Sequence, residues 1–220
     1  MNPKLTGEER KAQSRKTNDA KWTRVAEHGR PGYLASARTS TTSLSFMPRR
    51  YKADPSKGYF QVEWPLFGEL SRALALKVAR AYDPEIVVGI ATAGVIPGAV
   101  IAAILDRDFR SILISRRHDD DDDAPVRQTP AVLGAAPQEV GGRRVLIVDE
   151  TCESGDTLRL AVAALVNAGA KEVRTAVSFR TGPYEPDFHG LETESVIVLP
   201  WDREILVDGE LVPNPKYEAD

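Results

Sequence analysis

Three acidic residues and a turn of small residues lie close together in the carboxyl-terminal half of the chain. Asp149 and Glu150 follow four apolar residues, and Glu153 comes after two more. Residues 154–157, Ser-Gly-Asp-Thr, then lead into an apolar run with helical spacing. Carboxylates suit a sugar diol or a metal-bound ligand, and hydroxyl residues and glycine at a helix start leave backbone N–H groups free for a phosphate. The stretch therefore indicates a site where a phosphate lies next to a diol or a metal.

The elements that must position this stretch alternate between short apolar runs and amphipathic segments. Residues 144–148 read as a buried parallel strand, and a helix over 156–168 is expected to cross back. The polar turn between them then lies at the carboxyl end of a strand, where open α/β sheets bind ligands. Alternating strands and helices imply a mostly parallel sheet. The other predicted strands are 60–64, 85–90, 111–115, 173–179 and 195–199, and the other predicted helices are 66–81 and 96–105.

Residues 145–158 resemble the phosphoribosyl-diphosphate-binding signature of the type I phosphoribosyltransferases. That signature has an apolar strand, two acids, two variable residues and Asp-Thr-Gly-x-Thr, and this chain departs from it with Glu153 and Ser154. The resemblance implies the family's α/β fold, in which helices flank a mostly parallel sheet and carboxyl-terminal residues form a small hood. It also implies that ribose 5-phosphate passes from phosphoribosyl diphosphate (PRPP) to a nucleobase nitrogen, with release of pyrophosphate.

The same resemblance implies roles within the stretch. Asp149 and Glu150 would hold the ribose 2- and 3-hydroxyls and, indirectly, Mg²⁺, and Glu153 would take the place of the family's catalytic Asp. Since Glu is one methylene longer than Asp, its carboxylate lies about 1.5 Å further from the backbone. The implied 5-phosphate-binding residues are Glu153, Ser154, Gly155, Asp156 and Thr157.

The resemblance also implies pyrophosphate contacts after two other strands. One is the small-residue loop after strand 85–90, a type of turn that also serves tight packing. Purine-salvage members often carry Arg or Lys in this loop, and this chain does not, so less positive charge is available there. The other is the basic residue after strand 111–115. The implied pyrophosphate-binding residues are Ala91, Thr92, Ala93, Gly94 and Arg116.

The stretch 118–142 shows no helical or strand periodicity, and the family places here a flexible loop that closes over the reacting centre. Five successive acids, Asp119 to Asp123, repel one another and are expected to face water. Arg127 and Gln128 are the polar candidates for substrate contact in this loop.

The carboxyl-terminal third is expected to bind the acceptor base. Arg180 follows strand 173–179, where purine-salvage members have a Lys that donates to the oxygen of a 6-oxopurine, and a guanidinium can donate likewise. Residues 196–202 resemble the last strand of guanine, xanthine and hypoxanthine transferases, with its Pro-Trp-Asp ending. Trp201 is equally expected to anchor the edge of the core. The implied base-binding residues are Arg180, Val196, Ile197, Trp201 and Asp202.

Composition and charge fit one globular domain with an extension. The 220 residues are 42% hydrophobic, a single cysteine (Cys152) excludes an internal disulfide, and no apolar run could span a membrane. We therefore expect a cytoplasmic protein. Residues 1–50 carry 11 Lys/Arg and 4 Asp/Glu (+7), and the rest carry 18 and 28 (−10). We predict a basic, partly flexible extension over 1–50, a phosphoribosyltransferase domain over 51–205 and a tail over 206–220.

The predicted function is nucleotide salvage by a Mg²⁺-dependent glycosyltransferase that uses PRPP and a nucleobase, preferably a 6-oxopurine, and forms a homodimer. The basic extension is expected to pack on the acidic body or a partner subunit rather than to bind nucleic acid. Two alternatives stay open. One is a regulator of the same fold that binds PRPP or a nucleotide without catalysis. The other is an orotate-type pyrimidine phosphoribosyltransferase, which the Ala-Thr-Ala-Gly loop also resembles.

Overall fold

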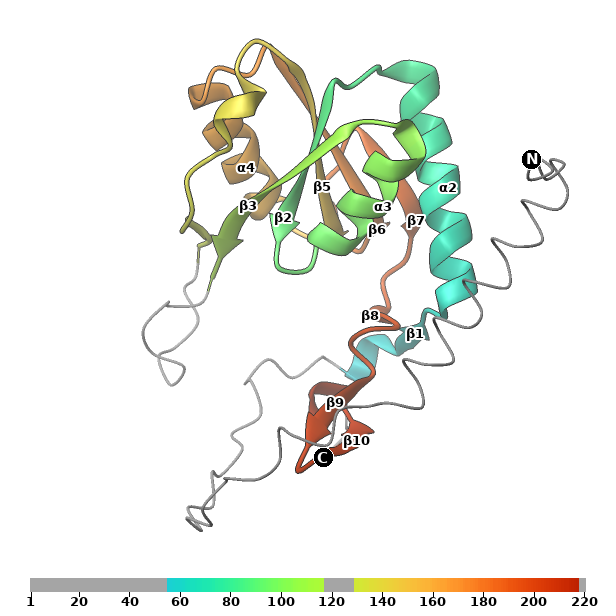
Figure 1. Cartoon of the computed structure of the whole chain (residues 1–220). Helices are drawn as coiled ribbons and strands as arrows, with labels where there is room; N and C mark the ends of the chain where they lie inside the picture. Colours follow the sequence, from blue (N-terminus) through green and yellow to red (C-terminus); the bar gives the residue numbers. More distant parts are fainter. Residues whose placement is uncertain (1–54, 117–128, 218–220) are drawn as a thin grey trace, which may run out of the picture. The chain divides into compact units, whose positions relative to one another are not determined.

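The computed structural model describes residues 55–116 and 129–217. Its centre is a six-stranded sheet in the order β4-β3-β2-β5-β6-β7, in which every neighbouring pair is parallel except β3 and β4. This arrangement confirms the predicted mostly parallel α/β fold (Figure 1). The strands are β2 (Ile86–Ala91), β3 (Asp108–Ser115), β4 (Ala131–Val132), β5 (Arg144–Cys152), β6 (Glu172–Arg180) and β7 (Phe188–Glu192).

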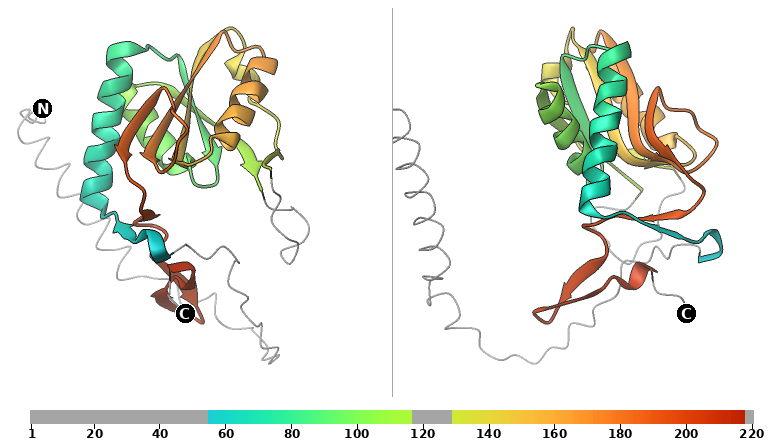
Figure 2. Two further views of the ribbon diagram at one scale, coloured as in Figure 1. Left: turned by 180° about the vertical axis from the view of Figure 1, so that it is seen from behind. Right: turned by 90° about the vertical axis from the view of Figure 1, so that its right-hand side faces the viewer.

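Helices cover both faces of the sheet. The helices are α2 (Trp64–Ala81), α3 (Val95–Leu105) and α4 (Asp156–Asn167). Helices α2 and α3 lie on one face and α4 on the other (Figures 1 and 2). Successive side chains of a strand point to opposite faces, so β5 serves both layers. Val145 and Ile147 pack with α4, whereas Leu146 and Val148 pack with α2 and α3, which explains why this strand is a continuous apolar run.

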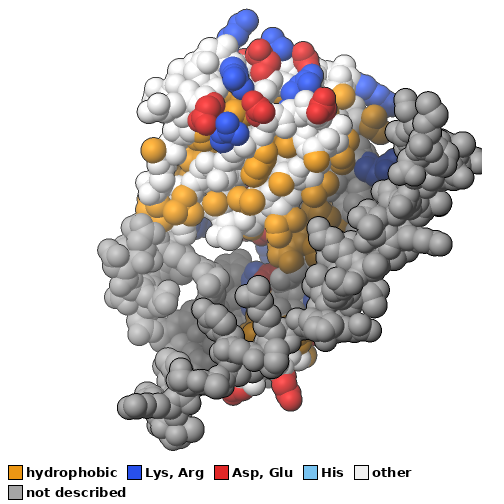
Figure 3. All heavy atoms as spheres, in the orientation of Figure 1, with side chains coloured by type: hydrophobic (Ala, Val, Ile, Leu, Met, Phe, Trp, Pro, Cys, Tyr) orange, Lys and Arg blue, Asp and Glu red, His pale blue; other side chains and the backbone are white. Residues whose placement is uncertain are grey.

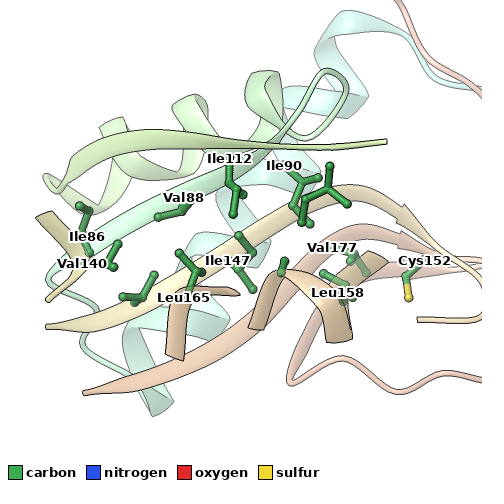
Figure 4. Packing of buried hydrophobic residues seen from close by; sticks show 13 residues of the cluster. Ile86, Val88, Ile90, Ile112, Val140, Ile147, Cys152, Leu158, Leu165 and Val177 are labelled. Carbon is green, nitrogen blue, oxygen red and sulfur yellow. The ribbon is translucent and has the colours of Figure 1, made fainter. Parts of the chain in front are cut away.

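The layer between the sheet and α4 is one apolar cluster (Figure 4). Leu158, Ala161 and Leu165 of α4 enter it at helical spacing and are fully buried. Cys152, at the end of β5, belongs to the same cluster, and burial raises the pKa of its thiol to about 11. Because burial favours the protonated thiol over the reactive thiolate, Cys152 acts in this structure as a packing residue.

The other strands form a hood beyond the carboxyl ends of the sheet strands (Figures 1 and 2). Within it, β1 pairs with β8 in parallel, and β9 pairs with β10 in an antiparallel hairpin. The hood elements are the 3-10 turn η1 (Pro55–Lys57), β1 (Tyr59–Gln61), β8 (Val196–Val198), β9 (Glu204–Val207), β10 (Glu210–Pro213) and the 3-10 turn η3 (Pro215–Tyr217). The hood thus continues past residue 205, where the sequence indicated a tail.

The two ends of the sheet differ in their charges. Acidic and basic side chains alternate over the end at which the strands begin (Figure 3). There the Asp83 carboxylate lies 3.0 Å from both Arg107 and Arg144, and Arg143 lies 3.3 Å from Asp108. Exposed pairs of this kind contribute little to the stability of a fold, because water and salt screen their charges. The charges at this end of the sheet are thus paired with one another. Two cavities lie at the opposite end, where the strands finish.

Several element boundaries differ from the prediction. Strand β5 continues through both acids to Cys152, because it stays paired with β6 up to Arg180. The predicted strand 195–199 does not join the main sheet, since β8 pairs with β1 instead. The edge beside β6 is taken by β7, a strand that is not among the predicted ones.

The stretch 118–142 also differs from the prediction. Within its described part, β4 pairs with β3, and residues Gln138–Val140 form a 3-10 turn, η2. Asp119 to Asp123, Arg127 and Gln128 lie outside the described residues, as does the extension over 1–50. No helix within 55–116 or 129–217 is long and apolar enough to cross a membrane.

Candidate active site

The turn between β5 and α4 forms a small cup. Gly155 stands at the N-cap of α4 with φ of 80°, a left-handed conformation that favours glycine. The first N–H groups of the helix have no acceptors within it, and the helix dipole adds positive potential at the same point. A cavity of about 100 Å³ lies here, lined by all five predicted 5-phosphate residues together with Arg116, Asp149, Thr151, Cys152 and Leu158. This geometry suits an anion.

Asp156, one of the acids of the cup, already accepts hydrogen bonds from nearby side chains. The Asp156 carboxylate accepts hydrogen bonds from Ser154 Oγ (2.9 Å), from Arg159 Nη1 (2.8 Å) and from Arg116 Nη2 (3.4 Å). Arg116 was predicted to contact pyrophosphate, and the structure places it beside the 5-phosphate cup. A phosphate that enters the cup must therefore share these donors with Asp156.

The loop after β6 supports the cup from behind. The Tyr184 ring lies so close to Gly155 that a Cβ on this glycine would be 2.2 Å from the ring. Gly182 packs against the backbone of Glu153, where a Cβ would be 2.7 Å from the carbonyl oxygen. Arg180 holds this loop, because its Nε donates to the carbonyls of Gly182 (3.2 Å) and Tyr184 (3.0 Å). The guanidinium of Arg180 thus shapes the cup indirectly.

The acid pair at the end of β5 is poorly solvated. Burial raises the pKa of Asp149 to about 7, although its carboxylate accepts a hydrogen bond from the backbone N–H of Glu150 (2.9 Å). Burial, reinforced by the charge of Asp149, raises the pKa of Glu150 to about 8. Hydroxyl donors or a cation would favour the ionised forms, so the pair is suited to a diol or a metal-bound ligand.

The predicted pyrophosphate loop meets the same acid pair. A Cβ on Gly94 would lie 2.6 Å from the carbonyl oxygen of Val148 and 2.8 Å from Cα of Asp149. Only a glycine permits this approach, so residues 91–94 lie directly against the end of β5. Gly94 of the loop therefore packs against Asp149, which also lines the cup.

A second cavity, of about 180 Å³, opens between the end of β5 and the hood. Its polar side chains come from several segments and include Glu150, Glu153 and Asp202. The Lys57 ammonium lies 3.0 Å from the Glu153 carboxylate, so the residue predicted to be catalytic is part of an ion pair. The remaining lining residues are Lys57, Thr151, Thr181, Glu194, Ser195, Val196, Ile197, Leu199, Lys216 and Tyr217.

Asp202 is fixed by the carboxyl-terminal segment. Asn214 Nδ2 donates to its backbone oxygen (2.9 Å) and its Oδ1 (3.2 Å), and Lys216 Nζ lies 2.9 Å from its Oδ2. The Tyr217 hydroxyl donates to the same Oδ2. Lys216 and Tyr217 therefore become part of the cavity wall through a residue that the sequence had already indicated.

The predicted base-binding residues divide into two groups. Val196, Ile197 and Asp202 line the second cavity, whereas Arg180 and Trp201 do not. The Trp201 ring packs against Phe67, with centroids 5.0 Å apart, as expected for an anchor at the core edge. Three residues of the cavity were not predicted from the sequence, namely Lys57, Lys216 and Tyr217, because no local motif surrounds them and only the hood brings them to the cavity.

Within the described residues, no cluster of three or more His, Cys, Asp or Glu side chains could hold a metal ion alone. Mg²⁺ is usually bound by one or two carboxylates together with substrate phosphates and water. Asp149 and Glu150 supply such a pair beside the anion cup, so they fit an ion that arrives with a phosphorylated ligand.

The chain is similar to known phosphoribosyltransferases. Residues 62–205 match the phosphoribosyl transferase domain family. Over 159 residues the chain is 29% identical to the xanthine-guanine phosphoribosyltransferase of Roseobacter denitrificans, and the match covers 67% of this chain and 88% of that protein. The crystal structure of a purine phosphoribosyltransferase from Pyrococcus horikoshii is 26% identical with a TM-score of 0.58, and covers 68% of this chain and 98% of that one.

Two further similar proteins are not named as purine phosphoribosyltransferases. The chain is 28% identical over 151 residues to the ribose-phosphate pyrophosphokinase of Maricaulis maris, a match that covers 68% of this chain and 44% of that protein. It is 29% identical over 144 residues to the transcriptional regulator GfcR of Archaeoglobus fulgidus, covering 62% and 71%. The chain thus spans less than half of the pyrophosphokinase.

Proposed function

Because this chain belongs to the phosphoribosyl transferase domain family, we propose that it transfers the 5-phosphoribosyl group of PRPP to a nucleobase nitrogen and releases pyrophosphate. The similarity to the xanthine-guanine and purine enzymes favours a purine acceptor, and a 6-oxopurine in particular. This corresponds to a role in nucleotide salvage, in the form of the homodimer predicted above.

The observation that carries the proposal is the junction of the two cavities. Thr151 and Glu153 line both the anion cup and the larger cavity under the hood. A ribose whose 5-phosphate occupies the cup would lie over Asp149 and Glu150, and its reacting carbon would face the larger cavity. A base in that cavity would then meet the sugar beside Glu153, which is the arrangement that a group transfer between them requires.

The proposed transfer breaks one bond, forms one bond and moves one proton, and few side chains take part. The bond from the ribose carbon to the pyrophosphate oxygen breaks, and its electron pair leaves with pyrophosphate. The base nitrogen forms the new bond to that carbon, and the proton it loses passes to the Glu153 carboxylate. Lys57, 3.0 Å from this carboxylate, offsets its negative charge before the base binds. When bound with PRPP by Asp149 and Glu150, Mg²⁺ would neutralise charge on the leaving pyrophosphate.

A turnover assay tests the proposal directly. The purified full chain is incubated with PRPP, Mg²⁺ and single bases, namely hypoxanthine, guanine, xanthine, adenine and orotate, and pyrophosphate release is measured. We expect release with at least one 6-oxopurine and none without a base. Selective turnover of orotate would instead support the pyrimidine alternative.

One observation favours a second candidate, a regulator that binds PRPP or a nucleotide without catalysis. Glu153 is paired with Lys57, and Asp156 accepts hydrogen bonds from donors of the cup, so both positions favour weak ligand binding over fast turnover. The similarity to GfcR points the same way. Binding of PRPP in calorimetry, combined with no pyrophosphate release for any base, would select the regulator.

A further inference from the structure

The carboxyl-terminal segment contributes a cation to the second cavity, the one between β5 and the hood, which we call the base cavity. The family match ends before this segment, at residue 205. The backbone N–H of Lys216 donates to Asn214 Oδ1 (3.1 Å), and its ammonium lies 5.0 Å from the centroid of the Tyr217 ring. The Lys216 ammonium also lies 2.9 Å from the Asp202 carboxylate. Lys216 is therefore held at both its backbone and its ammonium group. Its side chain is only 32% exposed, so the charge is oriented within the cavity wall.

The other cations near the cavity have different partners. Lys57 pairs with Glu153, at the junction with the anion cup. Arg180 does not line the cavity, because backbone carbonyls and the carboxylates of Glu185 (3.5 Å) and Glu192 (3.3 Å) surround its guanidinium. Lys216 is therefore the cation that the carboxyl-terminal segment contributes to the cavity, which Val196 and Ile197 also line.

The surroundings of Lys216 are acidic. The cavity is lined by the carboxylates of Glu153, Glu194 and Asp202 and by the ammonium groups of Lys57 and Lys216. An electron-rich oxygen of a ligand is repelled by the carboxylates and is accepted only where a donor faces it. An ammonium has three donors and no acceptor, and among the described residues Lys216 pairs with one carboxylate, so donors remain for a ligand.

We propose that Lys216 recognises the exocyclic oxygen of the acceptor base and thereby makes the site prefer oxopurines to adenine. The apolar wall of Val196, Ile197 and Leu199 suits the face of a planar ring, and Lys216 sets which edge of the ring is accepted. Adenine presents an amino group in place of the oxygen, and a donor-only side chain leaves that group unpaired. This inference rests on the proposed function, because it requires that a nucleobase occupies the cavity.

The test begins with the unaltered chain, so that the two proposals can fail separately. PRPP, Mg²⁺ and each of hypoxanthine, guanine, xanthine and adenine are supplied, and kcat and KM are measured for every base and for PRPP. If no base is turned over and no purine nucleoside monophosphate binds in calorimetry, the proposed function has failed. If turnover is observed, the variants below decide the role of Lys216.

Lys216→Met removes the donors and keeps a similar length. We expect kcat/KM for hypoxanthine to fall by about 10- to 100-fold, as for loss of a hydrogen bond to a charged group, while the KM of PRPP stays unchanged. The ratio of hypoxanthine to adenine turnover should fall with it, and Lys216→Arg should restore part of that ratio. Lys171→Met, an exposed lysine at the other end of the sheet, is the matched control.

Thermal unfolding distinguishes a variant that folds poorly from one that binds the base poorly. Thermal unfolding is recorded for each variant, and a variant with lower stability is compared by its hypoxanthine-to-adenine ratio, which a general loss of folded protein does not change. An unchanged ratio in Lys216→Met would overturn the proposal, because hypoxanthine and adenine would then have lost turnover equally.

Discussion

The anion cup and the base cavity lie side by side but are built in different ways. The cup is formed mainly by one continuous stretch, residues 149–158, supplemented by Arg116. The base cavity takes its lining from residues as distant as Lys57, Glu150, Thr181, Val196 and Tyr217. A local stretch is positioned by one strand-to-helix turn, whereas the cavity exists only after the hood has docked.

This difference shows where change is tolerated in the site. The cup depends on backbone N–H groups and on close packing, so few side chains can be exchanged without altering its shape. The base cavity depends on side chains from the hood, where an exchange alters recognition while the sheet stays intact. Under the proposed function, the phosphate-bearing half of the ligand and the base would thus be bound by structurally separate parts.

The largest effect is expected where the two regions meet. Glu153→Gln should lower turnover by about 10²- to 10⁴-fold, because an amide cannot accept the proton of the base nitrogen. Glu153→Asp should retain or raise turnover, since Asp stands here in the family signature. Steady-state pyrophosphate release measures both, and equal rates for all three proteins would show that this carboxylate takes no part.

The next effect tests whether the shape of the cup matters independently of the hood. Gly155→Ala should weaken PRPP binding by about 10- to 100-fold, because the new Cβ would lie 2.2 Å from the Tyr184 ring and overpacking displaces the turn. Gly142→Ala is the matched control, since Gly142 has φ of 72° but no atom within 4 Å of a Cβ. Calorimetry with PRPP compares them. Similar losses in both would mean that backbone strain, and not the cup, is responsible.

The acid pair should link stability to pH. Because the folded pKa values of Asp149 and Glu150 are raised to about 7 and 8, the folded chain keeps protons that the unfolded chain loses above about pH 4. The free energy of unfolding should therefore fall by several kcal/mol as pH rises from about 4 to 8, because each pKa is raised by about 3 and a change of 1 corresponds to about 1.4 kcal/mol. Urea unfolding across this range checks it.

The control for the pH effect is the double amide variant, Asp149→Asn with Glu150→Gln. It should lose most of the fall in stability and be more stable than the unaltered chain at pH 8.5, while Mg²⁺-dependent PRPP binding is weakened. Should PRPP bind the double variant with unchanged affinity, the two acids would be structural and not ligand-binding.

The smallest effect sharpens the description of the cup. Asp156→Asn should tighten binding of PRPP by up to about five-fold, because Arg116 and Arg159 are then available to phosphate and exposed ion pairs are worth about 0.2–1 kcal/mol. Asp108→Asn, which removes a similar exposed partner of Arg143 at the other end of the sheet, should have no effect on binding. Weaker binding in Asp156→Asn would indicate that Asp156 orders the turn.

The fold was predictable where the pattern of side chains is set locally. The alternation of strands and helices follows from apolar runs buried on both faces, as in residues 145–148, and from helical spacing, as at Leu158 and Leu165. Strand β7 was missed, because its five residues mix polar and apolar side chains and it is held mainly by pairing with β6. The pairing of β8 with β1 likewise joins segments that no local pattern connects.

The sequence by itself determined the anion cup, because a strand, an acid pair and a glycine turn fold next to one another with little chain between them. Only the tertiary structure decided which cations face the acceptor. It engaged Arg180 with the loop behind the cup and brought Lys57 and Lys216 to the cavity from opposite ends of the described chain. Contacts between such distant residues depend on how the hood packs on the sheet, and residue types at short spacing carry no record of that packing.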